Sequence, residues 1–208
     1  SDRLLDPAPS DLAPLYRKTD HWFQRATATL LGEVPCRLGC TSCCIGPFPI
    51  TLLDVHTLQQ GLAGLPPDHR HRIEQRAIEH TAAMEAAFPQ LTHRDLLDDW
   101  SDQEIDRLVT EFHHHPCPAL EADGGCGIYH HRPLACRSMG IPTEDRGLAH
   151  GACEVQTFIP ILRLPSALRE EEGRLAQEEA ASLDALRLAT GSTGEEVFLP
   201  YGFLPRET

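Results

Sequence analysis

Hydrophobic residues recur every three or four positions over five stretches of the chain, the interval that places them on one face of an α-helix. Tryptophan, phenylalanine, methionine and leucine supply most of these positions. The predicted helices cover residues 11–31, 51–62, 66–89, 101–112 and 166–189.

Residues at the ends of these stretches support the assignment. Thr51 is suited to cap the start of the second helix, and Ser101 with Glu104 forms the sequence pattern of a capping box. Pro67 is favourable in the first turn of the third helix, and Gly191 is a natural stop for the last. Sequence signals therefore predict both the existence and the limits of the helices.

Residues 116–160 are different, because they are rich in glycine, proline and cysteine and lack helical periodicity. We expect irregular loops or very short strands there, organised by a bound metal. The predicted fold class is mainly α, with helices packed around an irregular, loop-rich, cysteine-ligated metal centre. We expect a single domain over 1–208, with a metal-binding core over 36–153 and helical extensions over 1–35 and 160–208.

Net charge and hydropathy disfavour some classes of binding partner and of cellular location for this protein. The formal net charge of −13 disfavours nucleic acid as a partner, because such a field repels phosphate backbones. No apolar run approaches the roughly 20 residues of a membrane span, and aspartates interrupt residues 1–30, so we expect neither a membrane segment nor a signal peptide. The prediction is a cytoplasmic protein in a reducing compartment, with its oligomeric state open.

Eight cysteines fall in two groups along the chain. Four thiolates complete a tetrahedral zinc shell or hold one iron–sulfur cluster, so eight suffice for two sites. Gaps of two or three residues let a turn bring successive thiolates to one metal. The predicted metal ligands are Cys36, Cys40, Cys43 and Cys44 in the first group and Cys117, Cys126, Cys136 and Cys153 in the second.

Cys43 and Cys44 are adjacent, so their side chains point in different directions in most backbone conformations. Either they serve different metals, or one binds metal while the other packs or reacts. Their adjacency favours a bridge between two sites.

The residues around the second group carry a resemblance. The motif Cys117-Pro-x-Leu is followed by the motif Cys126-x-Ile-Tyr-x-x-Arg-Pro-x-x-Cys136-Arg. Together with the early group of cysteines, these motifs resemble those of bacterial cysteine-cluster proteins described as a zinc- or iron-chelating domain with a CxxCxxCC motif. The resemblance covers Cys36 to Cys153. It departs in the first motif, where three residues separate Cys36 and Cys40 instead of two.

The resemblance implies a metal centre built from the eight cysteines, with zinc or iron as the metal. Some relatives are described as iron–sulfur proteins, and the flagellin lysine methylases carry a similar cysteine cluster. An enzyme of that kind would bind S-adenosylmethionine, but no glycine-rich loop here indicates such a pocket. Whether the protein is an enzyme stays open.

Arg132 and Arg137 are candidate cofactor-binding residues, because fixed guanidinium groups reduce the charge of an anionic thiolate centre. The alternative for both is a surface pair with a carboxylate. His130 or His131 is a substitute ligand if Cys36 is excluded. The run over 113–115 is more typical of histidines in solvent at a helix end.

We favour one or two iron–sulfur clusters with a redox or electron-transfer role, served by a redox or protein partner. The alternative is a structural zinc module whose helices bind another protein. The spacing of Cys36, Cys40 and Cys43 also matches radical enzymes that use S-adenosylmethionine, but the chain lacks their strand–helix repeat. A disulfide framework is disfavoured by the absence of an export signal.

Overall fold

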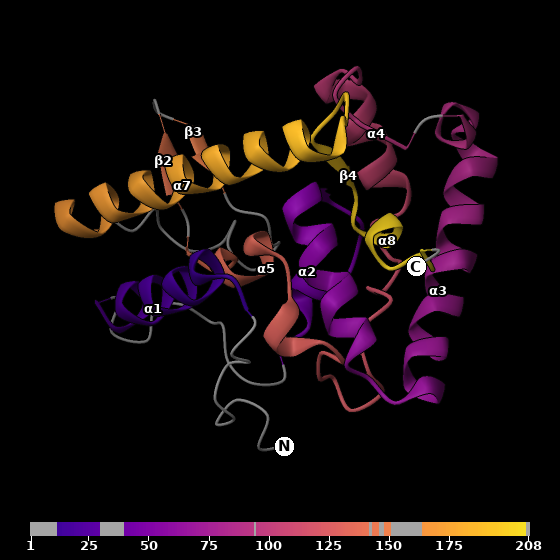
Figure 1. Ribbon diagram of the computed structural model, residues 1–208, viewed down its shortest axis with the longest axis horizontal. Helices are drawn as coiled ribbons and strands as arrows, with labels where there is room; N and C mark the ends of the chain where they lie inside the picture. Colours follow the sequence, from indigo (N-terminus) through magenta and orange to yellow (C-terminus); the bar gives the residue numbers. More distant parts are fainter. Residues whose placement is uncertain are drawn as a thin grey trace. The chain divides into compact units, whose positions relative to one another are not determined.

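The computed structural model of the protein describes residues 12–29, 40–93, 95–141, 143–145, 148–150 and 164–206, with only the backbone described in 143–145 and 148–150. These residues are mainly helical, which confirms the predicted fold class (Figure 1). The helices are α1 (Pro14–Thr29), α2 (Leu52–Ala63), α3 (Pro67–Ala87), α4 (Asp102–Glu111), α5 (Leu134–Ser138), α7 (Ser166–Thr190) and α8 (Leu199–Gly202).

Short elements join the helices. The 3₁₀ turns are η1 (Ser42–Cys44), η2 (Pro89–Thr92) and η3 (Tyr129–His131). The strands are β1 (Pro49–Thr51), β2 (Thr143–Asp145), β3 (Leu148–His150) and β4 (Glu196–Phe198), which form the antiparallel pairs β1–β4 and β2–β3. The predicted irregular region over 116–160 thus contains only short elements where it is described.

The chain forms two compact units, each built from two separate stretches. The first unit takes residues 1–43 and 134–182, and the second unit takes 44–133 and 183–208. The single domain over 1–208, with its core and its two extensions, stays a prediction.

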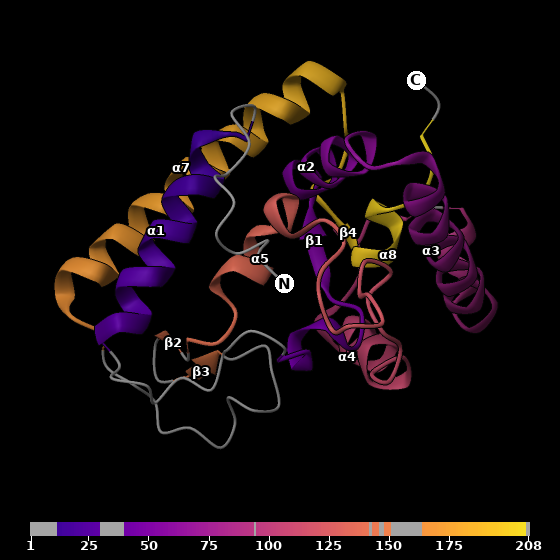
Figure 2. The same cartoon turned by 90° about the horizontal axis from the view of Figure 1, so that it is seen from below.

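The first unit is held by α1 and the first part of α7, which lie side by side in Figure 2. The indole Nε1 of Trp22 donates a hydrogen bond of 2.8 Å to the carbonyl of Leu168, and both side chains are buried. Lys18 pairs with Glu178 at 2.8 Å on the exposed side. Because exposed pairs contribute little, the buried apolar contact stabilises this packing.

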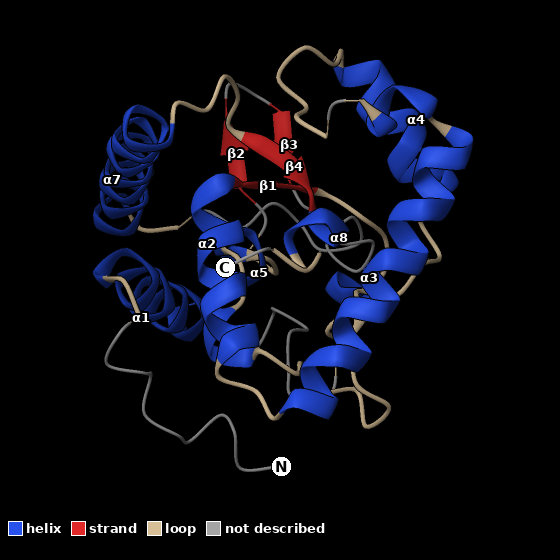
Figure 3. Cartoon of the chain, turned by 45° about the vertical axis from the view of Figure 1, so that its right-hand side comes forward, coloured by secondary structure: helices blue, strands red, loops and turns tan. Residues whose placement is uncertain are grey.

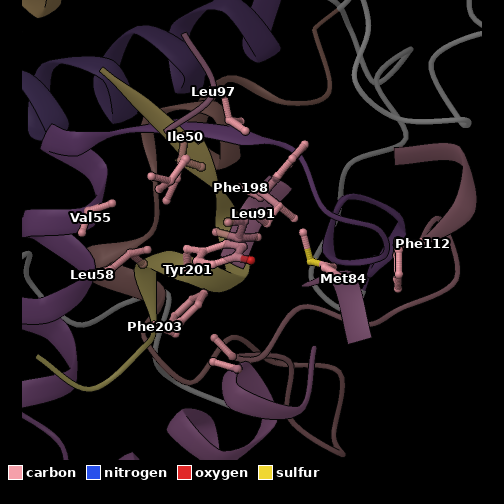
Figure 4. Packing of buried hydrophobic residues seen from close by; sticks show 14 of the residues in the cluster. Ile50, Val55, Leu58, Met84, Leu91, Leu97, Phe112, Phe198, Tyr201 and Phe203 are labelled. Carbon is pink, nitrogen blue, oxygen red and sulfur yellow. The ribbon is translucent and has the colours of Figure 1, made fainter. Parts of the chain in front are cut away.

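The second unit contains the larger core, which is gathered around β1, β4 and α8 (Figures 3 and 4). In the β1–β4 pair, Ile50 lies opposite Val197, and both are buried. The phenol of Tyr201 donates a hydrogen bond of 3.1 Å to Glu85 on α3. The core therefore joins the C-terminal segment to helices that lie far away in the sequence.

The predicted helix boundaries agree closely with the structure. The Thr51 hydroxyl accepts a hydrogen bond from the amide of Asp54, and Ser101 and Glu104 form a complete capping box. Gly191 follows α7 with a φ of 68°, a conformation that glycine adopts readily. These signals act within one turn of the chain, which is why sequence reveals them.

Four short elements were missed: β1, β4, α5 and α8. Each spans three to five residues, too few for a periodic pattern. In addition, β1 is defined by its pairing with β4 near the other end of the chain. No helix in the described ranges combines the length and the apolar character needed to cross a membrane.

Gly61 on α2 provides a stability test, because a Cβ at this position would lie 2.7 Å from the Cβ of His131. We expect Gly61→Ala to lower the free energy of unfolding by about 1–3 kcal/mol, although alanine favours helices more than glycine does. Urea unfolding monitored by circular dichroism measures the change.

Gly64→Ala is the matched control, since its Cβ would meet nothing closer than a carbonyl oxygen at 3.6 Å. Its expected effect is within about 0.5 kcal/mol. Equal effects of the two substitutions would contradict a specific contact between α2 and His131.

Candidate metal centre

Two cysteine-bearing segments pair in the second unit. The amide of Cys117 donates a hydrogen bond of 2.7 Å to the carbonyl of Cys44, and the amide of Gly46 donates one of 2.7 Å to the carbonyl of His115. Between these bonds, Ile45 and Pro116 form an antiparallel bridge. Backbone pairing thus places Cys44 and Cys117 opposite one another.

Cys117 begins a tight turn that leads to Cys126. The amide of Leu120 donates a hydrogen bond of 2.9 Å to the carbonyl of Cys117. Leu120 then pairs with Cys126 in a second antiparallel bridge, closed by a loop in which Gly124 has a φ of 80°. Residues 117–126 thus form a hairpin, the cysteine hairpin, which brings Cys126 back to the turn that begins at Cys117.

The Cys117 thiol lies in surroundings that disfavour its negatively charged form. Burial, followed by the nearby Cys126, raises the pKa of the Cys117 thiol to about 12. The amides of Ala119 and Leu120 donate hydrogen bonds to this sulfur, and these bonds and the charge of Arg76 act in the opposite direction. The net effect is that the metal-free protein keeps the Cys117 proton, so a thiophilic cation that replaces this proton would supply the positive charge that the thiolate needs.

Helix α3 holds the hairpin through Glu121. The carboxylate Oε1 of Glu121 lies 2.9 Å from His69 Nε2 and 3.3 Å from Arg76 Nη2. Arg76 Nη1 also donates a hydrogen bond of 3.1 Å to the carbonyl of Leu120. Burial raises the pKa of Glu121, but His69 and Arg76 together outweigh it, so this pKa lies below its usual value.

A small cavity lies beside Cys117 in the second unit. Its volume is about 10 Å³, which is close to the space of one water molecule. The imidazoles of His80 and His115 line it with their ring centroids 5.4 Å apart. Burial is the main cause that lowers the pKa of both histidines, which favours their neutral, metal-binding form.

Three more cysteines belong to the first unit. The sulfur of Cys40 lies 3.8 Å from the hydroxyl of Ser42, and Cys43 is in η1. Cys136 is on α5. These three cysteine residues and the three of the second unit are each partly exposed, and no disulfide joins any two of these six described cysteines.

The full ligand set is not assembled in the described residues. Cys36 and Cys153 lie outside them. Within 12–29, 40–93, 95–141 and 164–206, no three histidine, cysteine, aspartate or glutamate side chains are grouped so as to hold a metal ion. The eight-cysteine ligand set therefore stays a prediction, while the backbone contacts join Cys44, Cys117 and Cys126.

The two predicted cofactor-binding arginines have different surroundings. The guanidinium of Arg132 lies 4.1 Å from the centroid of the Tyr129 ring and donates to the Tyr129 carbonyl at 2.9 Å. Arg137 is only 1 % exposed; it pairs with Asp20 and lies over the ring of Tyr16. Their binding of a cofactor stays a prediction.

The histidines near the cysteines also differ from one another. His113 and His114 are exposed after the end of α4, and His113 lies 2.7 Å from the carbonyl of Thr110. This agrees with the predicted solvent position of most of the run. His115 is the exception, since it is partly buried and lines the Cys117 cavity.

Comparison with protein families matches residues 35–154, more than half of the chain, to the CxxCxxCC family, described as "Putative zinc- or iron-chelating domain". The chain belongs to this family. The family description indicates that the cysteine cluster chelates zinc or iron. No curated protein and no solved structure matches the chain.

Sequence reasoning missed two residues that lie at this CxxCxxCC cluster, Arg76 and His80. Both are on α3, a helix without cysteines that lies between the two cysteine groups in the sequence. Both interact with the segment that contains Cys117. With His69 and Ile73 they occupy positions i, i+4, i+7 and i+11 of the helix, a single face. This helical spacing is the feature of the sequence that could have pointed to Arg76 and His80.

The Glu121 contacts predict a pH effect. Because the folded-state pKa of Glu121 lies below the ordinary 4.5, its carboxylate stabilises the folded protein above that pH, and the contribution is lost as pH falls through the folded-state pKa. Wild type should therefore exceed Glu121→Gln in stability by about 1 kcal/mol near pH 7.

The difference should shrink toward zero as the solution becomes strongly acidic. Urea unfolding of the two proteins between neutral and acid pH measures it. A difference that stays constant over this range would show that the Glu121 charge contributes nothing.

Proposed function

We propose that this member of the CxxCxxCC family holds iron in one or two iron–sulfur clusters and serves in electron transfer. The observation that carries the proposal is the environment of Cys117: its segment pairs with that of Cys44, a bridge returns Cys126 to the same turn, and the amides of Ala119 and Leu120 are directed at its sulfur. Hydrogen bonds to sulfur and burial are the principal means by which proteins adjust cluster reduction potentials.

The residues have distinct parts in this proposal. Cys44, Cys117 and Cys126 are the ligands from the second unit, and Cys40, Cys43 and Cys136 are those from the first. Cys36 and Cys153 complete the proposed set of eight. A bound cluster would supply one-electron chemistry, and the surrounding residues would limit access of water to it.

The protein takes one electron from a reduced donor and passes the same electron to an oxidised acceptor, without net chemical change. The proposed partner is a redox protein. The net charge of −13 favours a basic docking surface on it, since complementary charge accelerates encounter. Arg132 and Arg137 remain proposed neighbours of the cofactor.

A structural zinc site is the second candidate, and one observation favours it. His80 and His115 line the cavity that Cys117 also lines, so nitrogen donors lie near thiol donors. Mixed cysteine and histidine shells are typical of structural zinc sites. In this case the helices would recruit another protein and no electron would be transferred.

Metal analysis of protein purified without oxygen separates the two candidates. The iron–sulfur proposal requires iron with acid-labile sulfide, and visible absorption that bleaches on reduction with dithionite. Zinc alone, in colourless protein, would reject this proposal in favour of the structural site. Protein that retains neither metal, and takes up neither when reconstituted, would exclude both functions.

The ligand assignment is tested by Cys117→Ser and Cys126→Ser. Each should reduce the bound metal by at least half relative to wild type, because a hydroxyl is a poor substitute for thiolate at iron or zinc. Elemental analysis of purified protein provides the measurement. Thr92→Ser, an exposed change in the same unit, should keep the full metal content.

Unchanged metal in both cysteine variants would remove the Cys117 hairpin from the proposed ligand set. A loss in the Thr92→Ser control as well would attribute the effect to handling of the protein and not to its ligands.

A further inference from the structure

One face of α3 lies along the cysteine hairpin. His69 contacts Glu121, and Ile73 Cδ1 lies 3.1 Å from the place where a Cβ on Gly127 would be. Arg76 contacts Leu120 and Glu121. Four residues at helical spacing, with His80 as the last, thus follow the hairpin from its loop toward Cys117.

Arg76 makes the most specific contacts of this face. Its two terminal nitrogens reach different acceptors, the Leu120 carbonyl at 3.1 Å and the Glu121 carboxylate at 3.3 Å. Leu120 is also one of the two residues whose amides donate to the Cys117 sulfur. A planar guanidinium suits two fixed acceptors, whereas an ammonium binds as a point charge.

The guanidinium of Arg76 has a third nitrogen, Nε, that takes no part in these contacts. Its Nε is buried and, among the described residues, has no hydrogen-bond partner. The side chain as a whole is only 33 % exposed. A cation screened from water in this way interacts more strongly with a neighbouring anion than an exposed one does.

We propose that Arg76 is a positioning residue of the metal centre, which holds the turn after Cys117 through the carbonyl of Leu120 and adds a positive charge to the same hairpin. This inference rests on the proposed binding of metal at Cys117 and deepens it. Metal thiolates are anionic, and a fixed cation nearby reduces their mutual repulsion. Arg76 thereby strengthens metal binding from a position outside the ligand set.

Zinc affinity of the full-length, reduced apoprotein tests the proposal, with Zn²⁺ as the probe in competition with a chromophoric chelator. Arg76→Gln should weaken zinc binding about tenfold or more, as is typical for residues that support metal ligands. Arg76→Lys keeps the charge and should recover part of the loss. Arg72→Gln removes the same charge from an exposed position on α3 and should leave the affinity unchanged.

Glu121→Gln separates charge from structural support. It keeps a side-chain acceptor for Arg76 but removes a negative charge, so zinc affinity should stay equal to wild type or rise. Thermal unfolding of the apoproteins reports structural damage independently. The proposal is supported by weakened binding in Arg76→Gln that exceeds the loss in Arg76→Lys, with affinity maintained in Glu121→Gln.

The proposal is overturned if Arg76→Gln binds zinc as wild type does. It is also overturned if Arg76→Gln, Arg76→Lys and Glu121→Gln all lose affinity equally and in proportion to their loss of thermal stability. If wild type binds neither zinc nor iron, the proposed function fails first, and the inference fails with it. The wild-type measurement therefore distinguishes the two failures.

Discussion

The cysteine hairpin of the second unit depends on hydrogen bonding to its neighbours, because it has few large apolar side chains of its own to bury. The amide of Cys117 binds the carbonyl of Cys44 on one side, and Arg76 binds the carbonyl of Leu120 on the other. Each of these bonds contributes about 1 kcal/mol. Together these bonds hold in place a backbone segment that contains glycine and proline and belongs to no regular helix.

This arrangement affects the free energy of metal binding. In small metal-held domains, the metal must order the ligand loops, and part of its binding energy is used for that. Here the turn after Cys117 and the return of Cys126 are already formed by backbone bonds within the second unit. Less ordering is then required of the metal at these two proposed ligands, and a ligand set that is held in advance binds more tightly.

The sequence was sufficient for features that depend on neighbouring residues. Helix limits follow from Thr51, Ser101 and Gly191, each of which acts within one turn. Membership of the CxxCxxCC family was likewise predictable, because the cysteine spacings and the residues between the cysteines carry the family pattern.

Features that depend on distant residues could not be predicted. The strand β1 exists because it pairs with β4, and Cys44 lies opposite Cys117 because their segments form a bridge. Arg76 was hidden for the same reason, since its importance comes from a hairpin that follows in the chain only after a 3₁₀ turn and a further helix, α4. Spacing indicates the candidate metal ligands, whereas tertiary contacts determine which of these candidates meet and what supports them.

The bridge between Ile45 and Pro116 has a consequence for self-association. In an antiparallel pair of this kind, the amides of the two bridged residues face outward, toward any strand that might be added. Proline has no amide hydrogen, so at Pro116 the exposed edge lacks the donor that an incoming chain would need. The Pro116 edge of the segment that positions the cysteines is therefore a poor template for an added strand, whereas the Ile45 edge keeps its amide donor, with the Ile45 residue 40 % exposed.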